Sequence, residues 1–525
     1  MKYFMILLVI VLFAFESLFY IQMLQQNSYN EKNRFLKFTL KNIKENINYF
    51  ALKLLFGISL ILFANFEFIL YVYFFLIMFI LIYSSVLQYK KYNKKLPLKF
   101  TKRVIRIFSL DVISYLILMI ICFNKNLTFL LGIELIFISL LPFVLIILNY
   151  ILYPVEKIIY EVYKNKAIKR LNKMENIAVI GITGSFGKTS TKMILNDILS
   201  VKYKGFCTAN SFNTPKGITK TINETESIFN DYFIAEMGAR AKGEIKQLCD
   251  IVHPKYGIIT SVGPAHLDTF KNIDIITKTK CELLESLPND GVIVLNKDNE
   301  YLRKYKPINR VKTLWFSLND NDADAYAYAS DIKYSDKGSV FTLHIKKKSI
   351  QVETTLLGKE NIYNIVSASL LANELGMSLK EIQKGISNIK VISHRLELKT
   401  SENITIIDDS YNSNPVGSQN AIEVLKLMKG KKVIITPGMV EMGKDEEKLN
   451  YEFGCKMANV CDRFYLIGKK RSKPIEKGII DENKKADIKV FNSFNEAYND
   501  FRKDFAKEKV TVLLENDLPD TYNEN

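Results

Sequence analysis

The residues best suited to chemistry lie in the segment 177–192, where an apolar run leads into the glycine-rich sequence Thr183–Thr189. The apolar run predicts a buried strand, and the residues from Lys188 onward predict a helix. A glycine-rich turn between a strand and a helix directs backbone N–H groups and a helix N-terminus at a phosphate chain. The Lys188 ammonium is then placed for the β- and γ-phosphates, and the Thr189 hydroxyl for Mg²⁺.

These residues predict an ATP site. Ile182 stands where the strict phosphate-loop motif has its first glycine, so the competing interpretation is a chance Gly-Lys-Thr sequence in a loop. The predicted nucleotide contacts in this segment are Thr183, Gly184, Ser185, Phe186, Gly187, Lys188 and Thr189.

The chain has 525 residues, too many for one domain, and its first 154 are far more apolar than the rest. Five stretches approach the length of about 20 apolar residues that spans a bilayer. They are residues 3–22, 51–67, 70–88, 108–124 and 128–150. Lys and Arg cluster between the first two stretches and between the third and fourth, which the positive-inside rule places in the cytoplasm. The sequence thus predicts a multi-pass domain, residues 1–154, in the bacterial cell membrane, with the catalytic domains in the cytoplasm.

The net charge of +17 could indicate a nucleic-acid-binding protein. Much of the excess lies in the loops beside the apolar stretches and in residues 157–173, so attraction to anionic inner-leaflet lipids is the simpler explanation. No nucleic-acid-binding motif is present. The six cysteines have no metal-ligand spacing and are predicted to be reduced thiols.

The rest of the chain predicts a basic linker helix, residues 155–175, and two α/β domains. In residues 176–394, short apolar runs alternate with helical stretches, which is the pattern of a mostly parallel sheet, and residues 323–357 alternate apolar and polar as in an antiparallel insertion. Residues 395–525 predict a Rossmann-like domain. The fold class is therefore a multi-pass α-helical domain, a P-loop parallel-sheet ATP-binding domain and a C-terminal Rossmann-like domain. Strands are expected at residues 232–236, 256–260, 291–295, 404–407, 432–436, 463–467 and 510–514.

Ten motifs follow one another from the ATP segment to the end of the chain. They are Thr183–Thr189, Asn210–Gly217, Glu236-Met-Gly-Ala, Ser261–Asp268, Thr279–Glu282, Gly358–Asn364, His394-Arg395, Asp408–Pro415, Thr436–Gly443 and Leu514–Asp520. In this order they resemble the Mur ligase family, the ATP-dependent enzymes that form amide bonds in peptidoglycan synthesis. The similarity is greatest to the branch that adds D-alanyl-D-alanine to a UDP-muramoyl tripeptide, and Asp408–Pro415 closely resembles that branch's signature. Thr436–Gly443 and Leu514–Asp520 also resemble this branch, and the resemblance implies that they shape the pocket of the incoming amine.

The resemblance implies a magnesium site. Its ligands would be Thr189, Glu236, His266 and Lys280, the last as an anionic carbamate, because an ordinary ammonium would be repelled by the metal. A surface glutamate, a structural histidine and an exposed helical lysine are the alternatives, and Lys278 is a rival for the carbamate.

The resemblance also implies nucleotide contacts from Asn361, Asn364, Asp409 and Tyr411, with Asp409 on the ribose. Glu360 replaces the histidine of the family motif. A helix N-cap at Asn364 and a plain Asp/Asn/Pro turn at residues 408–415 are the alternatives. Arg395 would reach the phosphates when the last domain closes. The implied catalytic residues are Lys188, Lys280, Arg395 and His266.

The implied activity is ligation of D-alanyl-D-alanine to a UDP-muramoyl tripeptide through an acyl phosphate, with ATP and Mg²⁺. Other cell-wall synthesis proteins are further possible partners. Family members usually begin with a soluble domain for the UDP-sugar, and here apolar stretches stand in its place. Three alternatives remain open: a related ligase with another donor or amine, such as a poly-γ-glutamate ligase, an ATP-binding scaffold, and a transporter. The transporter is disfavoured because the apolar stretches hold few charges, mainly Glu16, Glu67, Asp111 and Glu134.

Overall fold

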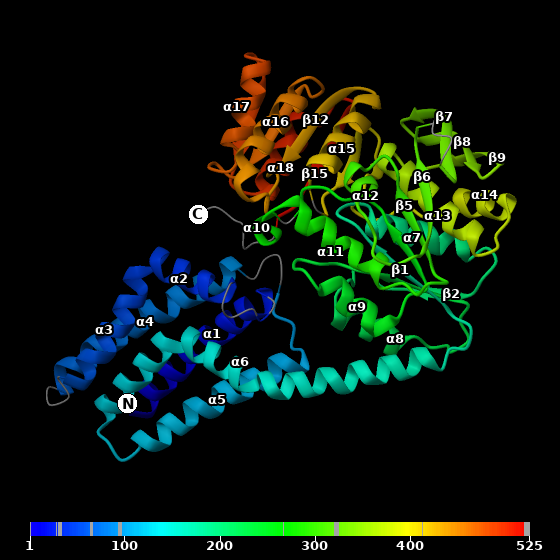
Figure 1. Cartoon of the computed structure of the whole chain (residues 1–525). Coiled ribbons are helices and arrows are strands. Elements are labelled where there is room, and N and C mark those ends of the chain that lie inside the picture. The colour runs from blue at the N-terminus through cyan, green and yellow to red at the C-terminus, as the bar shows by residue number, and fades with distance from the viewer. Residues whose placement is uncertain are drawn as a thin grey trace. The chain divides into compact units, whose positions relative to one another are not determined.

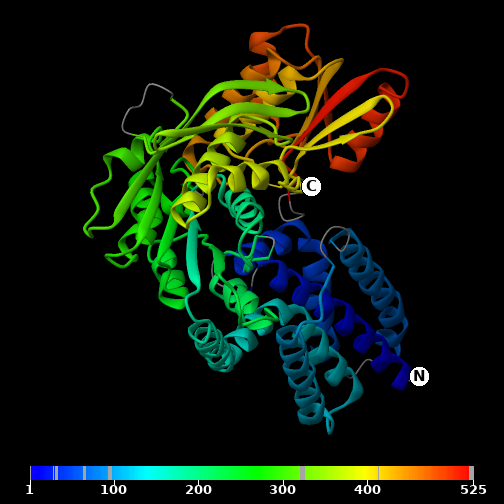
Figure 2. The ribbon, with the colours of Figure 1, turned by 90° about the vertical axis from the view of Figure 1, so that its right-hand side faces the viewer.

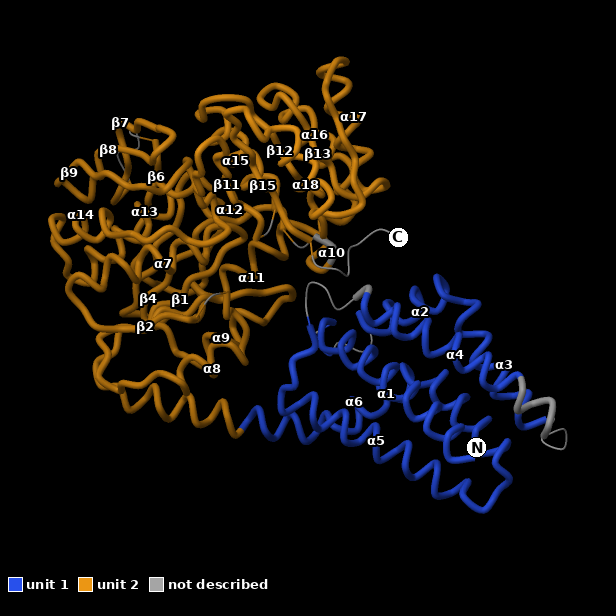
Figure 3. The backbone as a smooth tube through the Cα atoms, turned by 180° about the vertical axis from the view of Figure 1, so that it is seen from behind, with its two compact units in different colours: residues 1–161 blue, residues 162–525 orange. Residues whose placement is uncertain are grey.

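The structure is a computed structural model that describes residues 2–518 except 28, 30–33, 63–66, 93–96, 210, 266, 320–324 and 412. It contains two compact units, residues 1–161 and 162–525, which Figure 3 draws in different colours. Each unit is described separately below.

Helices are the only regular secondary structure among the described residues of the first unit. Its helices are α1 (Lys2–Gln26), α2 (Leu36–Glu45), α3 (Ile47–Leu62), α4 (Glu67–Tyr92), α5 (Lys102–Cys122) and the beginning of α6 (Leu127–Asn172). Every predicted apolar stretch falls largely within one of these helices. By length and composition four described helices could cross a membrane, or five if the bent pair α2 and α3 is counted as one span.

Polar groups lie inside the first unit as well. The Glu16 carboxylate, 1% exposed, accepts hydrogen bonds from Lys53 Nζ at 2.8 Å and from Ser85 Oγ at 3.1 Å. A buried carboxylate needs such partners, because burying an unpaired charge is costly. Glu16 is therefore a satisfied residue of the helical core.

Helix α6 continues without interruption from the last apolar stretch into the predicted linker, through Pro142 and Pro154. Its final turns belong to the second unit, where Ala167 and Leu171 are buried among apolar side chains. The Arg170 guanidinium donates to the backbone carbonyl of Thr225. The linker is thus the end of one 46-residue helix.

The second unit is built on two sheets (Figures 1 and 2). The first has the order β2-β3-β1-β4-β5-β6-β7-β8-β9. Its pairs are parallel from β2 to β7, and β8 is antiparallel to both β7 and β9. The strands are β1 (Ala178–Thr183), β2 (Gly205–Cys207), β3 (Tyr232–Glu236), β4 (Tyr256–Ile259), β5 (Val292–Asn296), β6 (Lys312–Ser317), β7 (Ala327–Ser335), β8 (Gly338–Ile345) and β9 (Lys348–Thr354). The predicted parallel sheet and antiparallel insertion are confirmed, and the yellow-green strands in Figure 2 are the insertion.

Both faces of this sheet are buried, as expected for parallel strands. On one face Ile180 and Ile182 of β1 pack in a core with α7 (Lys188–Leu199), α13 (Lys359–Glu374) and α14 (Leu379–Ser387). On the other face Val179 packs in a core with α8 (Pro215–Glu224), α9 (Glu244–Val252) and α11 (Ile273–Glu285). The short helices α10 (Leu267–Phe270) and α12 (Glu300–Lys304) lie in the connections.

The second sheet has the order β10-β11-β15-β12-β13-β14 and is parallel except for β10. Its strands are β10 (Glu397–Thr400), β11 (Ile404–Asp409), β12 (Lys431–Thr436), β13 (Arg463–Ile467), β14 (Asp487–Phe491) and β15 (Val510–Glu515). Helices α15 (Pro415–Leu427), α16 (Glu446–Ala458) and α17 (Lys473–Glu482) pack on one face, and α18 (Phe494–Asp504) packs on the other. All four strands predicted here are present.

Candidate nucleotide-dependent site

The glycine-rich turn follows β1 at the point where β1 lies between β3 and β4. The carboxyl ends of these parallel strands meet at one sheet edge, the usual position of a ligand crevice in such sheets. Gly187 begins α7 with φ of +79°, and a Cβ there would lie 2.6 Å from Asn364 Oδ1. A Cβ on Gly184 would collide with the Thr260 hydroxyl. Both glycines are therefore required by the packing of the turn.

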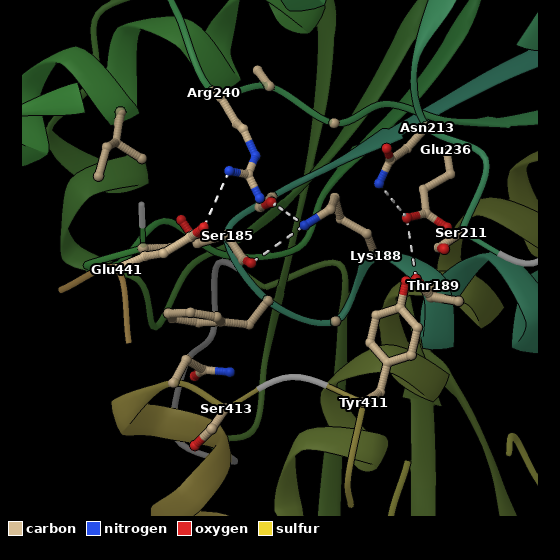
Figure 4. A pocket seen from close by; sticks show the side chains of 18 of the residues that line it. Ser185, Lys188, Thr189, Ser211, Asn213, Glu236, Arg240, Tyr411, Ser413 and Glu441 are labelled. Carbon is tan, nitrogen blue, oxygen red and sulfur yellow. Dashed lines mark hydrogen bonds and ion pairs between the residues drawn. The ribbon is translucent and has the colours of Figure 1, made fainter. Parts of the chain in front are cut away.

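Lys188 folds back over this turn. Its Nζ donates to the carbonyls of Gly184 at 2.8 Å and Ser185 at 3.3 Å (Figure 4). Desolvation lowers the pKa of Lys188, and the nearby charge of Glu236 opposes that effect. The ammonium is thus held at the mouth of the turn, where a phosphate group can replace the two carbonyls as its partner.

Glu236, the last residue of β3, is the centre of a cluster of polar side chains. Its Oε1 accepts from Thr189 Oγ1 at 3.1 Å and from Asn213 Nδ2 at 3.2 Å, and its Oε2 accepts from Lys192 Nζ at 3.0 Å. Lys192 and Glu236 are 0% and 1% exposed. The carboxylate and hydroxyl oxygens of this cluster are ligand types that suit a hard divalent cation.

Lys280 lies on α11 with only 4% of its surface exposed. Burial lowers the pKa of Lys280 to about 7, and the positive charge of Lys188 contributes. Its Nζ lies 5.8 Å from the centre of the Phe270 ring. An amine with this pKa is neutral in a large fraction of molecules at physiological pH.

Asn361 and Asn364 lie inside α13, so the alternative of an N-cap at Asn364 is wrong. The Asn364 amide oxygen accepts from Thr191 Oγ1 at 3.0 Å, and Asn361 Nδ2 donates to the Leu357 carbonyl at 2.9 Å. The first bond joins α13 to α7, and the second is local to the start of α13.

The C-terminal sheet contributes the opposite wall. The Arg395 guanidinium stacks over the Tyr411 ring at 4.3 Å. Asp409 accepts from the Leu396 backbone N–H at 3.2 Å. Burial raises the pKa of Asp409 to about 6 although Arg395 opposes it, and burial also raises that of Glu515, which lies close enough to Asp409 for the two charges to repel. The positive charge of Arg395 thus lies close to the buried carboxyl groups of Asp409 and Glu515.

A cleft of about 590 Å³ lies between the two sheets. Ten of the predicted site residues line it: Gly184, Ser185, Phe186, Gly187, Lys188, Thr189, Glu236, Lys280, Arg395 and Tyr411. Thr183, Asn361, Asn364 and Asp409 lie outside the lining, and His266 lies outside the described residues.

Sequence reasoning did not single out Lys192, Arg240, Glu441 or Glu515. Lys192 is four residues after Lys188, but a lysine within a helix is normally a solvent-exposed residue. Arg240 and Glu441 lie 3.2 Å apart across the cleft and 201 residues apart in the chain (Figure 4). No local pattern reveals such a pair. The only sequence signal was that Glu441 and Glu515 fall in the motifs expected to shape the site.

Two family models match the chain. The Mur ligase middle domain matches residues 182–372, and the Mur ligase glutamate ligase domain matches residues 394–515. Together they cover more than half of the chain. The first match contains the glycine-rich turn, Glu236 and Lys280, and the second contains Arg395, Glu441 and Glu515.

Curated relatives give the same result. The UDP-N-acetylmuramoyl-tripeptide–D-alanyl-D-alanine ligase of Escherichia coli is 31% identical over 294 residues, which are 55% of this chain and 64% of the relative. The ligase of the same name from Bacillus subtilis is 30% identical over 295 residues, which are 55% of this chain and 63% of the relative. The chain therefore spans slightly less than two thirds of the length of these relatives.

Solved structures share the fold. A crystal structure of MurF from Acinetobacter baumannii aligns with a TM-score of 0.61 at 25% identity, covering 69% of this chain and 78% of that one. The MurF ligase of Thermotoga maritima in complex with ADP aligns with a TM-score of 0.61 at 24% identity, covering 68% and 80%.

The comparisons correct the location predicted from the apolar stretches. The prediction of a multi-pass protein of the bacterial cell membrane is wrong, because the MurF enzymes to which the chain is similar are soluble cytoplasmic proteins. Its only support was the length and apolar composition of the N-terminal helices. Taken together, the two domain matches, the named relatives and the shared fold establish that the chain belongs to the Mur ligase family.

Proposed function

We propose that the protein is an ATP-dependent ligase that joins D-alanyl-D-alanine to the carboxylate of a UDP-muramoyl tripeptide in peptidoglycan precursor synthesis. The observation that carries this proposal is the composition of one cleft. It combines a glycine-rich turn with Lys188 on one wall, the Glu236 cluster beside it, and Arg395 with Tyr411 on the wall from the second sheet. The names of the relatives supply the two substrates.

The reaction has two steps. A carboxylate oxygen of the tripeptide attacks the γ-phosphorus of ATP, ADP leaves, and an acyl phosphate forms. The uncharged amine of the dipeptide then attacks the acyl carbon and loses one proton to water as the amide forms, and inorganic phosphate leaves with the oxygen that came from the carboxylate. Neither step forms a covalent bond to the protein, so its contribution is positioning and charge stabilisation.

Within this proposal Lys188 and Arg395 approach the phosphates from opposite walls. Lys188 exchanges its two carbonyl partners for phosphate oxygens, and Arg395 leaves the Tyr411 ring when the domains close. Asp409, Tyr411, Asn361 and Asn364 complete the nucleotide contacts or hold them in place.

Thr189, Glu236, His266 and carbamylated Lys280 would hold Mg²⁺. The ion neutralises phosphate charge when bound. Thr189 and Glu236 already meet at 3.1 Å, which fits this role. The low pKa of Lys280 leaves a neutral amine that can add CO₂ and release a proton to become an anionic carbamate.

The residue ranges 176–394 and 395–525 are the proposed ATP-binding and C-terminal domains. Closure between them would bring Arg395 to the nucleotide held by Lys188. A related ligase with another amine differs from this proposal in the amine substrate and therefore in the product.

The test uses the full-length protein with ATP, Mg²⁺, UDP-muramoyl tripeptide and D-alanyl-D-alanine. The expected result is equimolar phosphate and a product heavier than the tripeptide by one dipeptide less one water, with both signals lost in Lys188→Ala. Phosphate release with glutamate as amine and none with the dipeptide would instead favour the related ligase. Nucleotide binding without phosphate release or product would favour the ATP-binding scaffold.

A further inference from the structure

Lys192 and Glu236 form a buried ion pair directly beside the phosphate turn. Their side chains are 0% and 1% exposed, and Lys192 Nζ donates to Glu236 Oε2 at 3.0 Å. Lys192 lies on α7 three residues after Thr189, so the two side chains share one face of the helix and contact the same carboxylate. Glu236 and Thr189 line the cleft, whereas Lys192 does not (Figure 4). The carboxylate thus has a cation behind it, on the side away from the cleft.

Lys192 cannot leave this position at low cost. The neighbouring residues Ile194 and Leu195 of α7 belong to the apolar core of the sheet, and the Lys192 ammonium has no exposed surface. Separating a fully buried pair leaves two unpaired charges in the interior, which is strongly unfavourable. Pairs on the surface open easily by comparison. We therefore expect Lys192 to remain on Glu236 when ligands enter the cleft.

The remaining acceptor capacity of Glu236 is small. Its Oε1 accepts from Thr189 Oγ1 at 3.1 Å and from Asn213 Nδ2 at 3.2 Å, in addition to the Lys192 bond on Oε2. A carboxylate has about four lone-pair positions, so most of them are in use. A divalent cation that binds Glu236 must also displace the proton that Thr189 directs at it. Glu236 is thus a neutralised and largely occupied ligand before any substrate binds.

Other charges near the pair do not make up for this loss. Lys188 lies close enough to Glu236 for their charges to interact, and it adds a second ammonium group to the surroundings of one carboxylate. Glu244, whose charge acts on Lys280, already accepts the backbone N–H groups of Arg240 and Ala241. The described charges around Glu236 therefore favour an anionic phosphate chain over a bare divalent cation.

We propose that Lys192 is a fixed counterion of Glu236 and makes the binding of the divalent cation depend on the nucleotide. Without nucleotide the pair is neutral and attracts such a cation weakly, and the phosphates of ATP supply the negative charge that the cation requires. The inference rests on the proposed function, in which Thr189 and Glu236 are Mg²⁺ ligands. It extends that function by naming the residue that couples the two ligands, and by linkage the cation strengthens nucleotide binding by the same factor.

The experiment measures Mn²⁺ binding to the full-length protein by electron paramagnetic resonance, without nucleotide. CO₂-free buffer at pH 8 keeps Lys280, with its pKa of about 7, mostly as an uncharged amine. Lys192→Met should bind Mn²⁺ at least about tenfold more tightly than the unaltered protein, because the ion then meets an uncompensated carboxylate. The double variant Lys192→Met/Glu236→Met lacks both charges and should match the unaltered protein within about threefold.

The same ion should also stabilise the single variant. Because Mn²⁺ can replace the lost ammonium as the partner of Glu236, it should raise the urea midpoint of Lys192→Met. The midpoints of the unaltered protein and of the double variant should not change. Lys255→Met, which breaks an exposed pair with Asp290, is the matched control for loss of a lysine and should bind Mn²⁺ as the unaltered protein does.

A second arm adds a non-hydrolysable ATP analogue. After free ligands are removed by gel filtration, Mn²⁺ should stay with the unaltered protein only if the analogue was present. Failure to bind the analogue would overturn both the inference and the proposed function. Nucleotide-dependent retention of Mn²⁺ without any dipeptide-containing product in the ligation assay would refute the ligase and leave the role of Lys192 standing.

Two results would overturn the inference and leave the ligase standing. One is a gain in Mn²⁺ affinity of less than about tenfold in Lys192→Met, and the other is an unaltered protein that binds Mn²⁺ more than about threefold more tightly than the double variant. If Lys192→Met yields no folded protein, the comparison of the unaltered protein with the double variant decides alone. Equal affinities then support the inference, and tighter binding by the unaltered protein overturns it.

Discussion

The buried pair of Lys192 and Glu236 gives the most demanding prediction. The two groups are 0% and 1% exposed and 3.0 Å apart, so each charge is compensated mainly by the other. Replacing Lys192 with methionine keeps the volume but leaves a buried carboxylate without its cation. Breaking a buried pair in this way costs about 3–5 kcal/mol, a large part of the roughly 5–15 kcal/mol that stabilises a typical domain. Lys192→Met should therefore strongly destabilise the first sheet of the second unit.

The chain offers a clean probe for this measurement. Its single tryptophan, Trp315, lies on β6 in the same sheet as Glu236. Urea unfolding followed by Trp315 fluorescence without ATP should show that Lys192→Met lowers the free energy of unfolding. The double variant Lys192→Met/Glu236→Met should recover most of it, because the unpaired charge is then absent. Lys255→Met, which breaks an exposed pair with Asp290, should have little effect. A loss below about 1 kcal/mol in Lys192→Met, or a double variant no more stable than the single one, would refute the reasoning.

Three further predictions concern residues in the cleft or next to it in the sequence. Gly187→Ala places a Cβ 2.6 Å from Asn364 Oδ1 at φ +79° and should weaken ATP binding at least about tenfold by calorimetry, whereas Gly243→Ala, at φ +89° with open space around it, should not. Burial holds the folded-state pKa of Lys280 at about 7 against 10.5 unfolded, so in CO₂-free buffer stability should rise with pH between these values, and Lys280→Met should abolish that rise in the urea midpoint. Burial raises the pKa of Glu515 well above 4.5, so the unaltered protein should lose stability as pH rises above 4.5. Glu515→Gln should lose less stability over the same range, because it carries no charge and Ser413 can still donate to its amide oxygen. Equal urea midpoints for Glu515→Gln and the unaltered protein at pH 8 would contradict this prediction.

The helices, strands and turns whose own residues form a clear apolar or glycine-rich pattern could be predicted from the sequence. The turn at Gly184–Lys188 follows from a glycine-rich sequence between an apolar run and a helix, and the strands of the second sheet follow from short apolar runs. Strands β2, β10 and β14 were not predicted, because none of their residues is buried and their sequences lack a clear apolar signal. Strand β6 was also missed, although three of its six residues are buried.

The side chains that the fold brings together from distant segments could be predicted only in part. Resemblance placed Lys280 and Arg395 in the cleft. Lys192, on α7, was missed because its burial depends on Glu236, which lies 44 residues later in the sequence at the end of β3. The Arg240–Glu441 pair depends on how the two sheets face each other, which no local pattern encodes. The location was wrong because length and apolar composition were the only basis for it.

The acyl phosphate is the central claim, and an isotope measurement tests it most directly. The tripeptide carboxylate is labelled with ¹⁸O, and the full-length protein is supplied with ATP, Mg²⁺ and D-alanyl-D-alanine. If the cleft performs the two proposed steps, each molecule of product is accompanied by one phosphate that carries a single ¹⁸O atom, because the carboxylate oxygen that attacks the γ-phosphorus leaves with the phosphate. Unlabelled phosphate beside the dipeptide-containing product would contradict the acyl phosphate, and labelled phosphate without that product would contradict the amine.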